Sequence, residues 1–266
     1  MDCYLKWISI KLEIIRQQKL KKFLDLFSTL IFKFIIWLLS FLPYKIRIAI
    51  GSGFFTLIIS PILGNSQRIN KNLSHVMPKL TEKQKTKLAR SVNRNIGRTI
   101  FELFSPEQFS YFAKNAKIKG PGFEHLKIAN KSSRPIILVS GHYGNYDVVR
   151  ARLKKEDIDV GALYKPMQNK HFNQLYVDKI SKIGQPLFAR GRSGMSEMLR
   201  YLKMGNCVAI LFDQVMGKGE QLEFFGKTAY TATSVAKMAI KYNAVLIPFF
   251  SERQADGLSF ELYFDT

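Results

Sequence analysis

A long apolar stretch near the N-terminus restricts this chain more than any other feature. Residues 23–42 read FLDLFSTLIFKFIIWLLSFL, in which only Asp25 and Lys33 are charged. About 20 helical residues reach roughly 30 Å, which matches the hydrocarbon core of a bilayer. A second stretch, residues 48–63, carries no charged residue. The sequence therefore predicts either one or two buried core helices or, the interpretation we favour, membrane association.

Basic residues just before the first apolar stretch indicate its orientation. Arg16, Lys19, Lys21 and Lys22 lie there, and the positive-inside rule then places the N-terminus in the cytoplasm. A secretory signal peptide fits poorly, because the stretch is long, starts late and is not followed by a small-residue cleavage site. Its two internal charges, and Pro43 directly after it, favour a tilted or interfacial helix but leave a full span open.

The charge of the whole chain predicts an anionic partner. Among its 266 residues, Lys and Arg number 41 against 20 Asp and Glu, a formal net charge of +21. An anionic membrane, an acidic protein or a phosphorylated substrate would each match this excess. We expect no nucleic acid, because the charge is dispersed rather than concentrated in one basic stripe. The two cysteines, Cys3 and Cys207, indicate neither a disulfide framework nor structural zinc.

The sequence changes character after the second apolar stretch. We expect N-terminal membrane-associated helices over residues 1–63 and a second domain over residues 64–266. Residues 80–104 predict a long amphipathic helix, with Thr81 as the N-cap and Gln84 completing a capping box. Its apolar residues recur at helical spacing: Leu88, Val92, Ile96, Ile100 and Leu103.

From about residue 116, short apolar runs alternate with helical stretches. The predicted strands cover residues 135–139, 159–164, 207–212, 244–250 and 258–264, and the predicted helices between them cover 173–183, 193–205 and 231–243. This alternation predicts an α/β fold with a largely parallel sheet flanked by helices. Ligands of such sheets gather at the carboxyl ends of the strands.

A histidine and an aspartate follow the first of these strands, in the segment GHYGNYD at residues 141–147. Side chains five apart on a helix do not share a face, so His142 and Asp147 meet only if the chain turns at Gly144-Asn145. A carboxylate on one imidazole nitrogen fixes the tautomer, and the other nitrogen can then take a proton from a hydroxyl. We therefore predict a His142–Asp147 general-base dyad.

Two other loops supply candidate binding residues. Arg190 and Arg192 come just before a predicted helix that has Ser193 as its N-cap. Positive charge beside free N–H groups suits a phosphate or a carboxylate. Asp213 and Gln214 follow another strand, where they would either orient the site and hold a sugar or form a helix-capping turn.

The segment GHYGNYD resembles the His-x4-Asp/Glu signature of the lysophospholipid acyltransferase superfamily. It is more similar to the Gly-His-x-Gly-Asn-Trp-Glu motif of the bacterial lipid A late acyltransferases, the lauroyl- and myristoyl-transferases. Asp147 replaces their usual Glu, Tyr146 their usual Trp, and Lys165 an Arg that is often present. Further segments resemble the family in the same order: RINKNLSHVMP (68–78), NIGRTIFELF (95–104), GALYKPMQN (161–169), LFDQ (211–214) and FFGKTAYTATSVAKMA (224–239).

The resemblance implies a glycerolphosphate-acyltransferase-like domain over residues 64–266, one that ends earlier than family members usually do. It implies acyl transfer from acyl carrier protein to a hydroxyl of a phosphorylated lipid A precursor, a step of lipopolysaccharide biosynthesis at the cytoplasmic face of the bacterial inner membrane. No cofactor or metal is expected, because the thioester is already activated. Beyond the dyad, the residues expected to bind substrate are Asn145, Lys165, Arg190, Arg192, Asp213 and Gln214.

Two alternatives stay open. One is a glycerophospholipid or other glycolipid acyltransferase of the same superfamily, although the chain has no convincing Pro-Glu-Gly-Thr motif. The other is a basic membrane-binding protein without catalysis. The sequence specifies neither the acyl chain length nor the position of the acceptor hydroxyl, and it leaves open whether carrier protein or coenzyme A is the donor.

Overall fold

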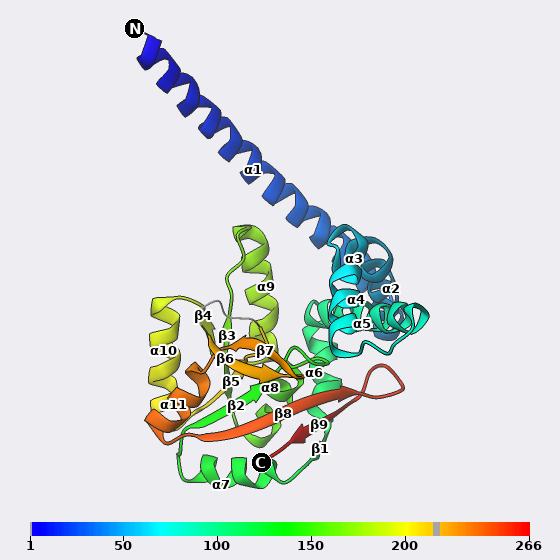
Figure 1. Ribbon diagram of the computed structural model, residues 1–266, viewed down its shortest axis with the longest axis vertical. Helices are drawn as coiled ribbons and strands as arrows, with labels where there is room; N and C mark the ends of the chain where they lie inside the picture. The colour runs from blue at the N-terminus through cyan, green and yellow to red at the C-terminus, as the bar shows by residue number, and fades with distance from the viewer. Residues whose placement is uncertain (1, 215–218) are drawn as a thin grey trace.

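The computed structural model describes residues 2–214 and 219–266. For residues 2–12 and 14 within this range, it describes only the helical backbone. A compact α/β body lies below a layer of helices, from which the long helix α1 (Asp2–Ser40) projects (Figure 1). The predicted fold class, a largely parallel sheet flanked by helices, is confirmed.

Helix α1 is not a buried core helix. Its segment Ile15–Ser40 is long and apolar enough to cross a membrane, and only 6% of the most apolar part is buried. Phe23, Phe27 and Trp37 are exposed. The helix contacts the body near its C-terminal end, where the ring of Phe32 packs edge-on against Phe104 at 4.7 Å between centroids.

The second apolar stretch is more deeply packed than the first. It forms α2 (Tyr44–Phe54), a π-helical turn (Phe55–Ile59) and α3 (Ser60–Ile62), which together form a second helix long and apolar enough to cross a membrane. Of its most apolar part, 28% is buried. We therefore find the segment Ile15–Ser40 of α1 largely exposed, whereas α2 is part of the packed helical layer.

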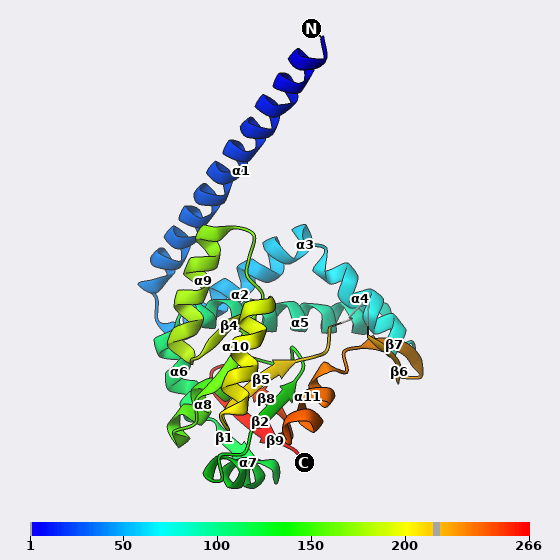
Figure 2. The ribbon, with the colours of Figure 1, turned by 90° about the vertical axis from the view of Figure 1, so that its left-hand side faces the viewer.

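Helix α5 (Glu82–Leu103) runs beneath α2, α3 and α4 (Asn65–Val76) and above the sheet (Figure 2). Its predicted capping box is confirmed, with the Gln84 backbone N–H donating to the Thr81 hydroxyl at 3.3 Å. The predicted apolar face is wrong in part, because Leu88 and Val92 are exposed. The buried residues instead recur every four positions: Lys85, Ala89, Asn93, Gly97 and Phe101.

Small residues on this buried stripe bring α2 and α5 unusually close together. A Cβ atom on Gly97 would lie 2.9 Å from the Cα of Ser52, and one on Gly51 would lie only 2.3 Å from Cγ of the Phe101 ring. The hydroxyl of Ser52 also donates to the Arg94 carbonyl at 2.7 Å. The tight approach explains why glycine, alanine and asparagine, rather than large apolar side chains, occupy this buried stripe.

The main sheet has seven strands in the order β1-β9-β8-β2-β5-β3-β4. All neighbouring pairs are parallel except β8 and β9, which are antiparallel. The strands are β1 (Lys117–Lys119), β2 (Ile136–Ser140), β3 (Val160–Tyr164), β4 (Leu187–Ala189), β5 (Cys207–Leu211), β8 (Val245–Arg253) and β9 (Phe260–Phe264).

The central strand β2 is buried along its whole length, and its side chains alternate between two cores. Ile136 and Leu138 pack with one cluster, and Ile137 and Val139 pack with the other. The first core is covered by α6 (Pro106–Lys114), α7 (Gly122–Lys131), α8 (Val148–Leu153) and the end of α9 (Lys170–Ile183). The second is covered by α10 (Arg192–Lys203) and α11 (Ser234–Tyr242).

A separate hairpin stands beside α4. It pairs β6 (Glu220–Phe224) with β7 (Lys227–Thr231), and its two turn residues, Phe225 and Gly226, both have positive φ. Positive φ at both central positions matches the right-handed twist of the two strands. The Phe224 and Phe225 side chains are exposed, so neither belongs to the core.

Candidate active site

The carboxyl ends of four neighbouring strands bring the charged candidates to one edge of the sheet. His142 follows β2, Asp213 follows β5, Lys165 follows β3 and Arg190 follows β4, and these strands are adjacent in that order. The ladder continues past the strands, because the Phe212 backbone N–H donates to the Ser140 carbonyl at 3.1 Å. One parallel register therefore sets the spacing of all four side chains.

The imidazole of His142 is held by Asp213. Its Nδ1 lies 2.7 Å from Oδ1 of Asp213, and its backbone N–H donates to Oδ2 of the same carboxylate at 2.8 Å. Partial burial acts to raise the pKa of Asp213, but the hydrogen bonds from His142 outweigh it and hold that pKa below its ordinary value. An ionised Asp213 accepts from Nδ1–H, so the tautomer leaves Nε2 with a free lone pair.

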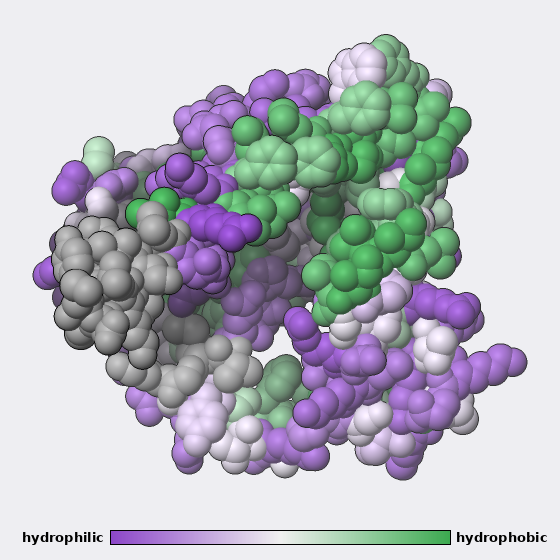
Figure 3. Space-filling model, turned by 90° about the horizontal axis from the view of Figure 1, so that it is seen from above, coloured by the Kyte–Doolittle hydropathy of each residue, from purple (hydrophilic) through white to green (hydrophobic). Residues whose placement is uncertain are grey.

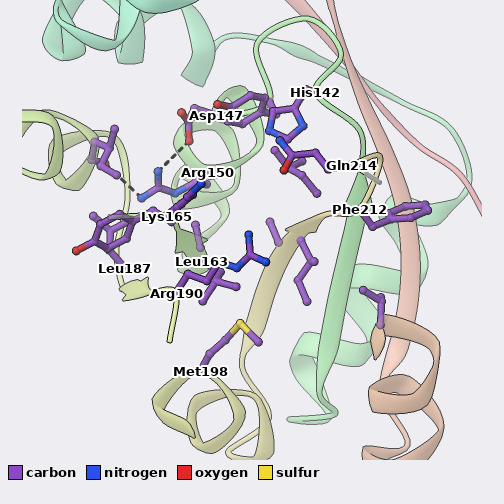
Figure 4. A pocket seen from close by; sticks show the side chains of 18 of the residues that line it. His142, Asp147, Arg150, Leu163, Lys165, Leu187, Arg190, Met198, Phe212 and Gln214 are labelled. Carbon is purple, nitrogen blue, oxygen red and sulfur yellow. Dashed lines mark hydrogen bonds and ion pairs between the residues drawn. The ribbon is translucent and has the colours of Figure 1, made fainter. Parts of the chain in front are cut away.

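Asp147 has a different partner in the structure. Its carboxylate forms an ion pair with Arg150 at 2.8 Å, and both side chains are buried. The Arg150 guanidinium also donates to the carbonyls of Ile180 and Gly184 in and just after α9. Figure 4 shows the Asp147 carboxylate directed at Arg150.

The predicted hydrogen bond between His142 and Asp147 is therefore not formed among the residues that the structure describes. Asp147 directly precedes α8, and Arg150 lies one helical turn further on, at a spacing that favours an ion pair. Asp213, from the neighbouring strand end, occupies the position beside Nδ1 instead. The role of Asp147 in catalysis stays a prediction, and the structure brings a second carboxylate into the site.

A pocket of about 400 Å³ opens beside His142 (Figure 4). Charged and polar groups at the strand ends line one part of it, among them His142, Lys165, Arg190 and Gln214. Much of the rest is apolar, and β3, β5, α10 and α11 contribute a large part of it: Leu163, Met195, Met198, Ile210, Val235 and Met238. A pocket of this size, mostly apolar with a few convergent polar groups, is typical of a binding site for one largely apolar ligand.

Three predicted binding residues lie outside this pocket lining: Asp213, which instead holds His142, and Arg192 and Asn145. Arg192 is exposed and forms the first residue of α10, whose N-cap is Gly191 rather than the predicted Ser193. The Ser193 hydroxyl donates to Glu197 instead, at 2.8 Å. Asn145 is only 2% exposed, and its side-chain amide donates to Glu102 at 2.8 Å. Asn145 therefore faces the protein interior in this structure.

Some residues in or near the site were not among the predicted site residues. Tyr146 lines the pocket, with its ring edge-on to the imidazole of His142 at 5.4 Å between centroids, and burial raises its pKa. Arg150 had a local signal, since it lies three residues after Asp147. Glu102 and Arg253 had none, because their ion pair joins distant parts of the chain.

Metal ligands do not cluster in the part of the chain that the structure describes: no group of three or more His, Cys, Asp or Glu side chains comes together there. The ionisable side chains of the described site include one imidazole, two carboxylates and the cations of the strand ends. These groups suit proton transfer beside an apolar ligand.

Comparison with known proteins identifies the family. The family model described as bacterial lipid A biosynthesis acyltransferase matches residues 16–265. A lipid A biosynthesis acyltransferase of Haemophilus influenzae is 23% identical over 231 residues, covering 86% of this chain and 72% of the relative. A lipid A biosynthesis lauroyltransferase of Escherichia coli is 22% identical over 235 residues, covering 86% of this chain and 74% of the relative. The chain belongs to the bacterial lipid A biosynthesis acyltransferase family.

Proposed function

We propose that this acyltransferase moves a fatty acyl chain from acyl carrier protein to a hydroxyl of a phosphorylated lipid A precursor. The observation that carries the proposal is His142, whose Nδ1 is bound by Asp213 while Nε2 is left free beside an apolar pocket. The relative named as a lauroyltransferase supports a saturated fatty chain as the group transferred. Family membership sets aside the alternative of a membrane-binding protein without catalysis.

In the proposed step, Nε2 of His142 takes the proton of the acceptor hydroxyl as its oxygen attacks the thioester carbonyl. The new C–O bond forms, the C–S bond breaks, and the leaving thiolate takes the proton back from the imidazolium. Asp213 stabilises that imidazolium through its contact with Nδ1. We retain the His142–Asp147 dyad as the second candidate, because it is the pairing that the sequence motif predicts.

The charges on the site support two anionic substrates. Lys165 and Arg190 line the pocket at neighbouring strand ends and are both exposed, so they are available to a phosphate. The net charge of +21 favours approach of an acidic carrier protein and of a phosphorylated lipid. The apolar lining would hold the acyl chain while the reacting carbonyl stays near His142.

Direct transfer assays test the proposal. Purified protein in detergent is incubated with lauroyl, myristoyl or palmitoyl carrier protein, or with the matching coenzyme A thioesters, and with an under-acylated lipid A precursor or lysophosphatidic acid. We expect a product heavier by one acyl group from carrier protein and lipid A precursor. Transfer only to lysophosphatidic acid would instead establish the glycerophospholipid alternative.

Arg190 and Arg192 make a matched pair for the acceptor site, because only Arg190 lines the pocket. A charge-assisted contact contributes roughly 1.5–3 kcal/mol, so Arg190→Ala is expected to raise the acceptor KM about ten- to a hundredfold. The kcat should change less, because the phosphate lies away from the bond being made. Initial rates at varied acceptor concentration measure this, with Arg192→Ala as the control. A defect seen only with carrier-protein donor would move Arg190 to donor docking.

We further propose that residues 1–63 attach the enzyme to the cytoplasmic face of the inner membrane and that residues 64–266 form the acyltransferase domain. Apolar side chains gather on the face from which α1 leaves the body (Figure 3). Those exposed from α2 to the residue after α3 are Ile46, Ile50, Phe54, Leu57, Ile58, Ile62 and Leu63. Together with the exposed apolar length of α1, they would face lipid.

Charge placed on α1 tests this attachment without disturbing the body. Leu24, Phe27 and Phe34 are exposed, and a lysine near the centre of a membrane-embedded helix costs about 2.5–3.5 kcal/mol. The triple lysine variant is therefore expected to move largely from the membrane fraction to the supernatant in flotation experiments. The control replaces Ile128, Met204 and Ile240, which are exposed on the α/β body, by lysine. Equal flotation of both variants would contradict attachment through α1.

A further inference from the structure

A buried ion pair joins helix α5 to strand β8. Glu102, near the end of α5, has no exposed surface, and both of its carboxylate oxygens accept from the guanidinium of Arg253 at the end of β8. Arg253 also donates to the side chain of Asn95 and to the Gly257 carbonyl, each at 3.2 Å. All three guanidinium nitrogens of Arg253 therefore donate hydrogen bonds, either to α5 or to the loop that follows β8.

The same carboxylate extends to the turn that carries His142. The amide of Asn145 donates to Oε2 of Glu102 at 2.8 Å, and its carbonyl oxygen accepts from the backbone N–H of Asp147 at 3.1 Å. The backbone carbonyl of Asn145 accepts from the Ser251 hydroxyl of β8 at 2.5 Å. Glu102 therefore connects α5 and β8 to Asn145, and through Asn145 to the Asp147 end of the turn at residues 142–147.

The turn has little freedom where it lies against β8. Gly144 has a φ of +60°, and a Cβ atom there would lie only 2.2 Å from the Ser251 carbonyl oxygen. A backbone packed this closely moves as a unit with its hydrogen-bonding partners. Loss of the Asn145 contact would therefore displace the turn on which His142 is mounted, although Glu102 itself does not line the pocket.

We propose that Glu102 is a positioning residue, which acts through Asn145 to hold His142 in its reactive place. The inference rests on the proposed function of His142 as general base. A buried ion pair is weak evidence for stability alone, since apolar residues of similar size often serve as well. Because the carboxylate of Glu102 also accepts from Asn145 in the catalytic turn, it can hold that turn in place. Such positioning matters, since displacement of a reacting group by about 1 Å can cost about a hundredfold in rate.

The network also ties the site to the helical layer. Helix α5 carries Glu102 five residues after Gly97, where Ser52 of α2 packs closely, and next to Phe101, against which Gly51 of α2 packs. The position of the catalytic turn therefore depends on the same helix that seats the second apolar segment. This is a physical link between the membrane-facing helices and the chemistry at the sheet edge.

A double-mutant cycle on Glu102→Gln and Asn145→Ala tests the proposal. Glu102 accepts three hydrogen bonds from Arg253 and Asn145, whereas glutamine has one accepting oxygen in place of two and turns a donating NH2 group toward a guanidinium that can only donate. We expect each single variant to lower kcat about ten- to a hundredfold, with the acceptor KM changed less than about twofold. In the Asn145→Ala background, Glu102→Gln should cost less than about a further twofold, because the link is already broken.

Leu126→Ala supplies the control for simple destabilisation. Leu126 is fully buried on α7, so its loss should lower the melting temperature while the folded protein keeps its kcat within about twofold. If Glu102→Gln fails to fold, the kcat of Asn145→Ala alone tests the positioning role, since this variant leaves the ion pair between Glu102 and Arg253 intact. Unchanged kcat in Asn145→Ala, or additive losses in the cycle, would overturn the positioning role.

Hydrogen exchange separates this inference from the proposed function. Peptides that cover the turn at residues 142–147 should exchange faster in Glu102→Gln and Asn145→Ala than in the parent protein. In Leu126→Ala, the exchange rate of these peptides should not change. Absence of acyl transfer by the parent protein would defeat the proposed function alone. Unchanged exchange of the turn in both variants would defeat the positioning role alone.

Discussion

His142→Ala is expected to lower kcat by about a hundred- to ten-thousandfold, the usual contribution of a positioned general base. His142 is the only imidazole in the described pocket lining. Its side chain is partly exposed at the strand end, so its removal leaves no buried cavity. The variant should therefore stay folded and stay with the membrane while transfer fails.

Transfer rates at saturating donor and acceptor measure this effect, together with thermal unfolding and membrane flotation. His125→Ala is the matched control, because His125 is exposed on α7, outside the pocket lining. Added imidazole should restore part of the activity of His142→Ala by replacing the missing base. Near-normal turnover of His142→Ala would remove the histidine from the mechanism.

Local patterns predicted the elements that carry this site. The strand predicted over residues 135–139 is β2 (Ile136–Ser140), and the helix predicted over residues 80–104 is α5 (Glu82–Leu103). Both depend on nearby residues, namely an apolar run and a capping box. The position of His142 after a strand could therefore be read from sequence, and so could the turn that follows it.

The partner of His142 could not be read in the same way. Asp213 lies 71 residues further along the chain and reaches the imidazole only because β5 pairs with β2 in parallel. Strand order is set by the packing of the whole domain, and the sequence pattern does not contain it. The ion pair of Glu102 with Arg253 depends in the same way on where α5 meets β8.

The prediction of the packed face of α5 failed for a different reason. Apolar periodicity assumes that large side chains fill the space between elements. Where two helices approach as closely as α2 and α5 do, glycine and small polar residues form the contact, and Leu88 is exposed instead. The apolar run that predicted β2 succeeded, because this strand lies between two ordinary apolar cores.

Asp213→Asn is expected to lower kcat by about a hundred- to ten-thousandfold. The backbone N–H of His142 still needs an acceptor, so the asparagine carbonyl should remain on it and turn the amide toward Nδ1. An amide that donates to Nδ1 places the imidazole proton on Nε2, which then has no lone pair to take the proton of the acceptor hydroxyl. The fold should persist, because Asp213 is partly exposed. Thermal unfolding and single-turnover transfer rates measure the two effects separately.

Asp147→Asn is expected to act through Arg150 instead. It leaves a buried guanidinium without its carboxylate, which costs about 3–5 kcal/mol of folding free energy. The folded fraction should regain most of its kcat in the double variant Asp147→Asn, Arg150→Met, because the unpaired charge has been removed. A His142–Asp147 dyad predicts the reverse: Asp213→Asn would be mild, and the double variant would stay inactive even when fully folded. Comparing kcat per folded molecule across these variants therefore identifies which carboxylate orients the catalytic imidazole.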